Sequence, residues 1–170
     1  MSFDILAQAA RQKDSHEHGA AKLMMVMEGK KLQVEFEVPS ESLIGFEHFP
    51  KSQSNRKNFN EAIKILSDPS KLFLIPIKAE CLLVGMNVSQ SLFSNEEEHG
   101  HDESEKSEIH SEFKSNYSWN CQHLDEIDSI GTQLMSFFFG IEEIRVNWIS
   151  NNGQGSLELE SKDDRIKGWE

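Results

Sequence analysis

Two short segments of the sequence carry paired histidines whose spacing suits the binding of one metal ion. Residues 16–19 read HEHG and residues 99–102 read HGHD, so one residue separates the two histidines of each pair. In an extended chain, residues i and i+2 point to the same side, which lets both imidazoles of a pair reach one ion. Zinc binds neutral imidazole nitrogen and carboxylate oxygen, although imidazole also binds copper and nickel. The candidate ligands in these pairs are His16, His18, His99 and His101.

The second pair lies in an acidic segment of low complexity, residues 94–112. The segment holds eight acidic residues, a third histidine at His110, and one apolar residue, Ile109. Such a composition cannot bury enough surface to order itself, so we expect a mobile, exposed loop. Its carboxylates raise the local concentration of divalent cations, and the loop is expected to hold exchanging ions. The alternative is a solvated linker in which the histidines have no role.

Glu47 and His48 form a different kind of candidate, because they lie in the short apolar segment GFEHFP at residues 45–50. The aromatic flanks and the proline are expected to hold His48 rigidly against the core. A rigid, partly buried histidine is a better tight ligand than a mobile one. Neighbouring residues rarely ligate the same ion, so Glu47 is expected to orient the imidazole. The alternative is a core histidine that Glu47 satisfies with a hydrogen bond.

The charge balance of the 170-residue chain favours cations as partners. Against 17 Lys and Arg stand 29 Asp and Glu, which gives a formal net charge of −12. Such a surface repels nucleic acids and anionic membranes, and no apolar run approaches the ~18 residues that a membrane span needs. The sequence shows no phosphate loop, dinucleotide fingerprint or nucleophile elbow, so no enzymatic activity is expected. The remaining enzymatic alternative is a metallohydrolase with three histidine ligands and Glu47 as its general base.

The N-terminal segment and the cysteines indicate an oxidising compartment. Residues 7–9 form an A-x-A pattern after a short apolar stretch, so residues 1–15 read as a signal remnant and flexible N-terminus. A meaningless disordered leader is the alternative. Cys81 and Cys121 suggest a disulfide, which for a loop of about 40 residues would stabilise the fold by about 4 kcal/mol. Two buried thiols rank second, and a metal pair of Cys121 with His123 ranks last.

The apolar periodicity predicts strands at both ends of the chain. Residues 22–38 read as a β-hairpin that turns at residues 28–30. Residues 144–159 read as a closing hairpin that turns at Asn152 and Gly153. Between the hairpins, residues 72–93 predict one long strand or two short ones, and residues 112–119 predict another.

Two helices are expected among these strands. The first is expected to begin after the cap Ser54, to place apolar residues on one face, and to stop at Pro69. That face consists of Phe59, Ala62, Ile63 and Leu66. The second helix is expected over residues 124–138, with Gly140 at its C-cap. The order ββ-α-β-(His/acid loop)-β-α-ββ predicts an α+β fold, with two helices on a largely antiparallel sheet. We expect one zinc-binding domain over residues 16–169.

Several of these motifs together resemble the ZrgA-type periplasmic zinc-binding proteins, a bacterial family. The resemblance rests on HEHG at residues 16–19, on LIGFEHFP at residues 43–50, and on the closing hairpin around residues 144–146. Cys81 and Cys121, which flank the His/acid-rich insert, also match the family. The resemblance covers roughly residues 16–169.

The resemblance implies export to the periplasm, zinc binding, and no catalysis. The protein would capture Zn²⁺ and hand it on near a zinc ABC importer or a TonB-dependent receptor. We predict that His16, His18 and His48 converge on a primary site, which a carboxylate or a loop histidine completes. A mobile secondary site is predicted at His99, His101 and His110. The alternative is a non-catalytic docking or structural domain of the envelope whose histidines are incidental.

Overall fold

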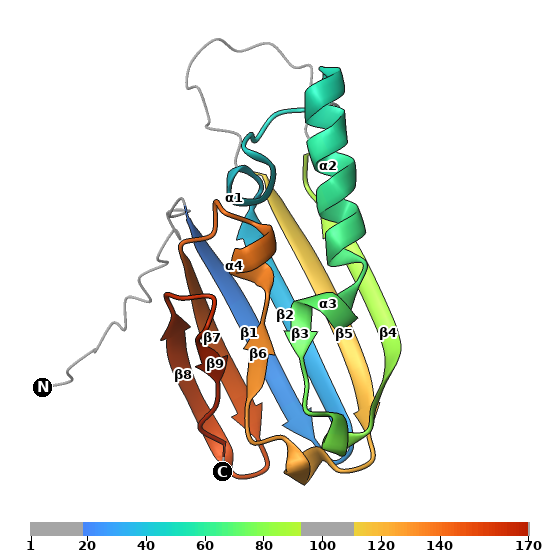
Figure 1. Ribbon diagram of the computed structural model, residues 1–170, viewed down its shortest axis with the longest axis vertical. Coiled ribbons are helices and arrows are strands. Elements are labelled where there is room, and N and C mark those ends of the chain that lie inside the picture. The colour runs from blue at the N-terminus through green and yellow to red at the C-terminus, as the bar shows by residue number, and fades with distance from the viewer. Residues whose placement is uncertain (1–18, 93–110, 170) are drawn as a thin grey trace, which may run out of the picture.

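A computed structural model of the chain describes residues 19–92 and 111–169 and confirms the α+β fold (Figure 1). Its largest element is a six-stranded sheet with the order β4-β5-β2-β1-β7-β8. Neighbouring strands in this sheet are antiparallel, except for the parallel pair β1 and β7. These strands are β1 (Ala20–Glu28), β2 (Lys31–Pro39), β4 (Cys81–Gln90), β5 (Glu112–Cys121), β7 (Glu143–Ser150) and β8 (Gly153–Leu159).

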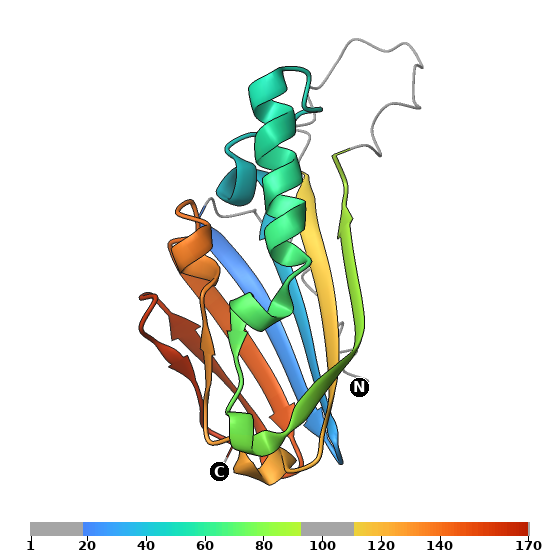
Figure 2. The same cartoon turned by 45° about the vertical axis from the view of Figure 1, so that its right-hand side comes forward.

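A second layer covers one face of the six-stranded sheet (Figure 2). It contains a small sheet with the order β3-β6-β9, the helices, and two 3₁₀ turns. The small sheet consists of β3 (Phe73–Leu74), β6 (Ile130–Thr132) and β9 (Arg165–Ile166). The helices are α1 (Ser40–Ile44), α2 (Gln53–Leu66), α3 (Pro69–Leu72) and α4 (Leu134–Phe137), and the 3₁₀ turns are η1 (Ile77–Ala79) and η2 (Leu124–Glu126). Among the helices of the described ranges, none has the length and apolar content that a membrane crossing requires.

The core lies between the two layers and follows from the period of two along each strand. In the predicted first hairpin, Leu23 and Phe36 are buried and paired across β1 and β2, whereas Lys22 and Glu35 are exposed. Alternation of this kind places every second side chain on the core face and leaves the other face open to solvent. The hairpin predicted for residues 22–38 is therefore confirmed.

Helix α2 buries the face that the sequence predicted. Ala62 and Leu66 are buried, and Phe59 and Ile63 pack against the core. The predicted ends of the helix are wrong by a few residues. The N-cap is Ser52, whose Oγ accepts a hydrogen bond from the backbone N–H of Asn55 at 3.0 Å. Such a cap stabilises a helix by about 1 kcal/mol.

Pro69 does not mark the end of α2, which already ends at Leu66. The proline instead occupies the first turn of α3. A proline is well suited to that position, because the first amides of a helix have no partner within the helix. The stop signal in the sequence was therefore the start of the next short helix.

The second predicted helix, residues 124–138, is wrong. This region forms η2, β6 and α4 in turn, and β6 pairs with both β3 and β9. Ile127, Ile130 and Leu134 are buried as the helical spacing required, but they are buried from three different local structures. Gly131 disfavours a helix, and a Cβ there would meet side chains of the flanking strands at 3.2–3.4 Å. Pairing with two strands thus outweighs the helical periodicity.

Residues 72–93 contain two strands, in agreement with one of the two predicted alternatives. β3 is followed by η1, and Glu80 adopts a left-handed conformation with φ 49° before β4 begins. The pairing of β4 with β5 shifts between Leu83 and Gly85, which indicates a bulge. In the closing hairpin, Ser150 pairs with Gly153, so the turn is formed by residues 151–152, one position before the predicted one.

Cys81 and Cys121 form the predicted disulfide. They are directly opposite each other at the ends of β4 and β5 and are separated by 40 positions in the sequence. The bond excludes both free thiols and a metal pair of Cys121 with His123. It closes the end of the sheet at which β5 finishes.

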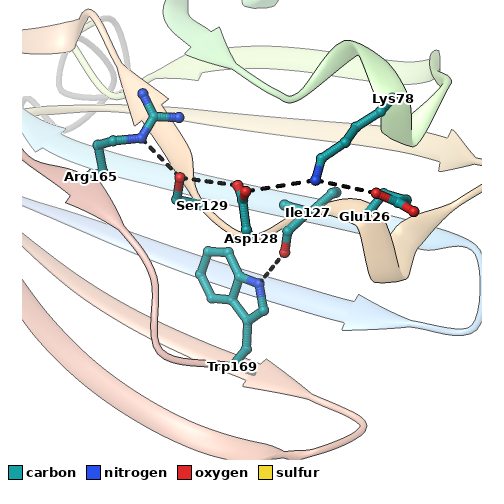
Figure 3. A network of polar contacts seen from close by, with 7 residues as sticks. All are labelled: Lys78, Glu126, Ile127, Asp128, Ser129, Arg165 and Trp169. Carbon is teal, nitrogen blue, oxygen red and sulfur yellow. Dashed lines mark hydrogen bonds and ion pairs between the residues drawn. The ribbon is translucent and has the colours of Figure 1, made fainter.

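A network of polar contacts fastens the C-terminal residues to η2 and η1 at the same end of the sheet (Figure 3). Trp169 donates its indole N–H to the carbonyl of Ile127 at 2.6 Å, and both residues are buried. Lys78 lies 3.2 Å from a Glu126 carboxylate oxygen, and Arg165 donates to Ser129 at 2.9 Å. The buried hydrogen bond is the stronger contribution, because exposed ion pairs stabilise a fold by less than about 1 kcal/mol.

Candidate metal site at the α1 end of the sheet

The candidate site lies around α1, at the end of the sheet where β1 and β5 begin (Figure 1). The helix follows directly on β2 and ends at Gly45, whose φ of 81° is left-handed. Gly45 donates its backbone N–H to Glu41 O at 2.8 Å, which closes the helix. Glycine adopts this conformation without a Cβ penalty, so the chain turns sharply into residues 46–50.

The chain enters the described structure at Gly19, which is fixed to α1. Its backbone N–H donates a buried hydrogen bond to Ser42 Oγ at 3.2 Å. The carbonyl of Gly19 accepts hydrogen bonds from the backbone N–H groups of Glu142, at 2.8 Å, and Glu143, at 3.1 Å. Gly19 is therefore held between α1 and the start of β7.

The acidic segment rejoins the described structure at Ser111, which is fixed to Ser40, the first residue of α1. Ser40 donates its backbone N–H to Ser111 O at 2.9 Å, and Ser111 Oγ donates to the carbonyl of Glu47 at 3.2 Å. Ser111 is 2% exposed, so both contacts are shielded from water. Because α1 has five residues and is roughly 7 Å long, these contacts bring three parts of the sequence to one place.

His48 presents an oriented imidazole to solvent at this place. Its ring stacks on Phe46 with centroids 5.0 Å apart and an interplanar angle of 24°. Its Nδ1 lies 2.9 Å from the carbonyl oxygen of Phe49. A carbonyl oxygen only accepts, so Nδ1 carries the proton and the lone pair of the neutral ring is at Nε2. This is the arrangement in which a histidine binds a metal through one nitrogen while a backbone carbonyl orients the other.

One sequence-based expectation for this segment needs correction. His48 is exposed, not partly buried, so the alternative of a satisfied core histidine is also excluded. Phe46 and Phe49 both contact the ring, and the predicted role of Glu47 in orienting it stays a prediction. The side chain of Glu47 is half-buried, and its backbone carbonyl accepts the hydrogen bond from Ser111.

Glu142 is a candidate that sequence reasoning missed. A Cβ placed on Gly19 would lie 3.2 Å from Cγ and Cδ of Glu142 and 3.3 Å from its Oε2, so this carboxylate lies against Gly19. The backbone hydrogen bonds from Glu142 and Glu143 to the carbonyl of Gly19 bring the two segments together. Gly140 lies beside them against α1, because a Cβ added to it would be 2.5 Å from the carbonyl oxygen of Ser42. No local signal in the sequence pairs residue 142 with residue 19.

Lys114 on β5 forms ion pairs with two carboxylates of β2 beside the site, Glu37 and, at 3.9 Å, Glu35. Lys114 Nζ lies 2.9 Å from a Glu37 carboxylate oxygen. This hydrogen bond holds the pKa of Glu37 below its ordinary value and raises the pKa of Lys114. The lysine charge is thus already compensated and does not oppose a cation at α1.

The other described histidine, His123, lies at the far end of β5. Its Nε2 is 3.9 Å from a Glu80 carboxylate oxygen, and its ring is exposed. The ten residues of β5 separate it from Ser111 by about 30 Å. His123 therefore cannot share an ion with His48.

Five of the predicted ligands lie outside the described residues, namely His16, His18, His99, His101 and His110. Within residues 19–92 and 111–169, no three His, Cys, Asp or Glu side chains are close enough together to hold a metal ion. The described part of the chain thus offers single donors at α1, of which His48, Glu142 and Glu41 are exposed.

Comparison with known proteins assigns the chain to a family. A search of curated proteins finds no match. The family model described as "ZrgA family zinc uptake protein" matches residues 15–168, which is most of the chain. It is the family that the histidine pair, the GFEH segment and the cysteines resemble. On this match, the chain belongs to the ZrgA family of zinc uptake proteins.

Proposed function

We propose that this protein is a periplasmic, non-catalytic zinc-binding protein that captures Zn²⁺ and hands it to an importer. Membership of a zinc uptake family supports zinc as the cargo. The disulfide supports an exported protein, because such bonds persist in oxidising compartments such as the periplasm. The A-x-A pattern at residues 7–9 is consistent with the same compartment.

The observation that carries the proposal is the meeting of three anchors at α1. His18 directly precedes Gly19 in the sequence, and Gly19 is hydrogen-bonded to Ser42. His110 directly precedes Ser111, and Ser111 is hydrogen-bonded to Glu47, the residue before His48. The two residues that follow these histidines are therefore both fixed to one short helix, near the exposed imidazole of His48.

We assign the primary site to His16, His18 and His48, with a carboxylate as the fourth ligand. Glu142 is the best-placed carboxylate, since it lies against the residue that follows His18. Three imidazoles and one carboxylate form a suitable tetrahedral set for zinc. The secondary site, made of His99, His101 and His110, would collect ions and exchange them with the primary site.

A competitive zinc titration against a chelating indicator tests this proposal. The samples are the full chain and a variant in which a short glycine linker replaces residues 95–110. The base of this insert is closed, because Ser91 donates its N–H to Glu112 O at 3.1 Å and Glu112 donates to Ser91 Oγ at 2.9 Å. The deletion should therefore leave the paired strands intact.

The full chain should bind zinc with submicromolar affinity, and one tight site should survive the deletion. Loss of tight binding with the insert would contradict the primary site at α1. No binding by either protein would favour the alternative of an envelope docking domain with incidental histidines. In that case excess zinc would also leave the melting temperature unchanged, because only a metal that binds the native state stabilises it.

Transfer to an importer needs a test of its own. Deletion of the gene in the source bacterium should slow growth when zinc is limiting, and added zinc should restore growth. The His48→Ala variant should fail to complement the deletion, whereas the His123→Ala variant should complement it. Equal growth of all strains under zinc limitation would argue against a role in zinc supply.

A further inference from the structure

Two phenylalanines that follow one another closely at the end of α4 are exposed to solvent. Phe139 is 89% exposed and Phe137 is 40% exposed. Among the described residues, no other Phe, Tyr or Trp side chain is exposed. Single aliphatic side chains are common on protein surfaces, whereas aromatic side chains are enriched where proteins contact each other. The two rings, which we call the Phe137/Phe139 surface, therefore indicate a contact with another molecule.

The local structure holds both rings away from the core. Phe138, which lies between them, is buried and has an extended backbone, with φ −122° and ψ 91°. Successive side chains of an extended segment point to opposite sides, so Phe137 and Phe139 both point away from the core that receives Phe138. The backbone of Phe138 is fixed on both sides, since it donates to Leu134 O at 2.9 Å and accepts from Ile141 N at 3.0 Å. The exposure of the two rings is thus built into the fold.

The Phe137/Phe139 surface adjoins the candidate metal site. α4 and α1 lie at the same end of the six-stranded sheet (Figure 1). Gly140 follows Phe139 directly, and a Cβ added to it would lie 2.5 Å from the carbonyl oxygen of Ser42 on α1. Phe139 is therefore one residue away from a close contact with α1. A protein that covers the two rings also covers part of the helix that precedes the His48 segment.

We propose that the Phe137/Phe139 surface is the docking site for the protein that receives zinc from this chain. This inference rests on the proposed function. In zinc uptake the metal is passed on, and direct exchange of ligands requires that the receiving protein reach the site. His48 is exposed at this end of the sheet, where a docked protein would meet it. A second copy of the chain is disfavoured as the occupant, because each copy carries a net charge of −12.

The chemistry of the two helices defines the surface that would receive them. The rings of Phe137 and Phe139 require an apolar pocket that removes them from water. Glu41, the residue before Ser42 on α1, is exposed. Together with the net charge of the chain, it favours basic groups around that pocket. The opposite charges would speed the encounter, and the buried rings would hold the complex together.

Growth of the deletion strain under zinc limitation tests the proposal, together with competitive zinc titration of the purified variants. A double variant, Phe137→Ser with Phe139→Ser, should bind zinc with wild-type affinity but should fail to complement the deletion. The matched control is Ile77→Ser, because Ile77 is 95% exposed and lies in η1, at the opposite end of the sheet. The control should complement as the wild type does. Thermal melting and immunoblots should show that both variants are folded and equally abundant.

Two results of these experiments would overturn the proposal. The first is wild-type growth with the double variant, or a growth defect of equal size in the Ile77→Ser control. The second is a loss of zinc affinity in the double variant, since the rings would then support the metal site itself. Failure of the proposed function has a different signature, because the wild type itself would then bind no zinc or restore no growth.

The contact can also be detected in the wild-type fold, without removing the two rings. A photoreactive phenylalanine analogue at residue 139 should form a cross-link in zinc-limited cells, and mass spectrometry should identify the attached protein as a component of a zinc importer. The same analogue at residue 77 should give no such cross-link. Absence of the cross-link at residue 139, or its presence at both positions, would overturn the proposal.

Discussion

The hydroxyl of Ser111 lies 3.2 Å from the carbonyl oxygen of Glu47 and donates a hydrogen bond to it. This contact joins two places that are 64 positions apart in the sequence: the end of the acidic segment and the residue before His48. It is one of the anchors that hold the histidine-bearing segments at α1. The first prediction concerns its removal.

Replacing Ser111 with alanine should weaken zinc binding several-fold and lower stability by about 1 kcal/mol, the usual contribution of one hydrogen bond. The substitution removes the buried hydroxyl, so the carbonyl of Glu47 loses the hydrogen bond that Ser111 donates to it. The control is Ser89→Ala, because Ser89 Oγ also donates to a strand carbonyl at 3.2 Å, but at an exposed position of β4. Equal zinc affinity in the two variants, measured by competitive titration, would remove this contact from the account.

Replacing Gly140 with alanine should destabilise the protein by about 1–3 kcal/mol, the usual cost of overpacking. The added Cβ would lie 2.5 Å from the carbonyl oxygen of Ser42, so α1 would have to move. The matched control is Gly85→Ala, whose Cβ would meet Ser118 at an ordinary 3.7 Å. Chemical denaturation should separate the two variants. Similar midpoints would show that α1 is not packed closely against residue 140.

Replacing both Cys81 and Cys121 with alanine should lower stability by about 4 kcal/mol on the chain-entropy model. The disulfide closes the end of the sheet opposite α1, so zinc affinity should stay the same at temperatures where the variant is folded. Denaturation under oxidising and reducing conditions checks the first part. After expression in a bacterial periplasm, the intact mass of the protein should be two hydrogens below the reduced value. A large loss of zinc affinity in the folded variant would contradict the separation of the two ends.

Tyr117 should ionise only at strongly alkaline pH. Burial raises the pKa of Tyr117 to about 12, and its hydroxyl donates a 2.7 Å hydrogen bond to the carbonyl of Leu66. A pKa raised by folding favours the folded state fully below the unfolded value of about 10, and this stability is lost as the pH rises from about 10 to about 12.

The tyrosine prediction is simple to measure, because the chain contains one tyrosine. The ultraviolet absorbance of tyrosinate should appear near pH 12, and the protein should lose stability as this pH is approached. Tyr117→Phe should abolish the signal. A transition near pH 10 in a protein that is still folded would show that the hydroxyl is not buried under α2.

The hairpins and the buried face of α2 were predictable because each is set by local periodicity. Leu23 and Phe36 alternate with charged residues, and Ala62 and Leu66 recur at helical spacing. Residues 124–138 have the same helical spacing, yet they fold otherwise. The pairing of β6 with strands around residues 74 and 165 decides their structure, and no local pattern encodes those partners.

The candidate site shows the same division. The chemistry of His48 follows from its residue type, and the stiffness of its segment follows from the flanking aromatic residues. The nearness of Gly19, Ser111 and Glu142 to α1 comes from the sheet order, in which strands distant in the sequence become neighbours. For this reason, nothing in the sequence near Glu142 marked its carboxylate as a candidate ligand.

The central claim is that zinc binds at the α1 end of the sheet through His48. A competitive zinc titration of His48→Ala against His123→Ala tests it most directly, since both histidines are exposed and stand at opposite ends of β5. We expect at least a tenfold loss of affinity, about 1.4 kcal/mol, for His48→Ala and wild-type affinity for His123→Ala. Wild-type affinity in both variants would contradict the claim.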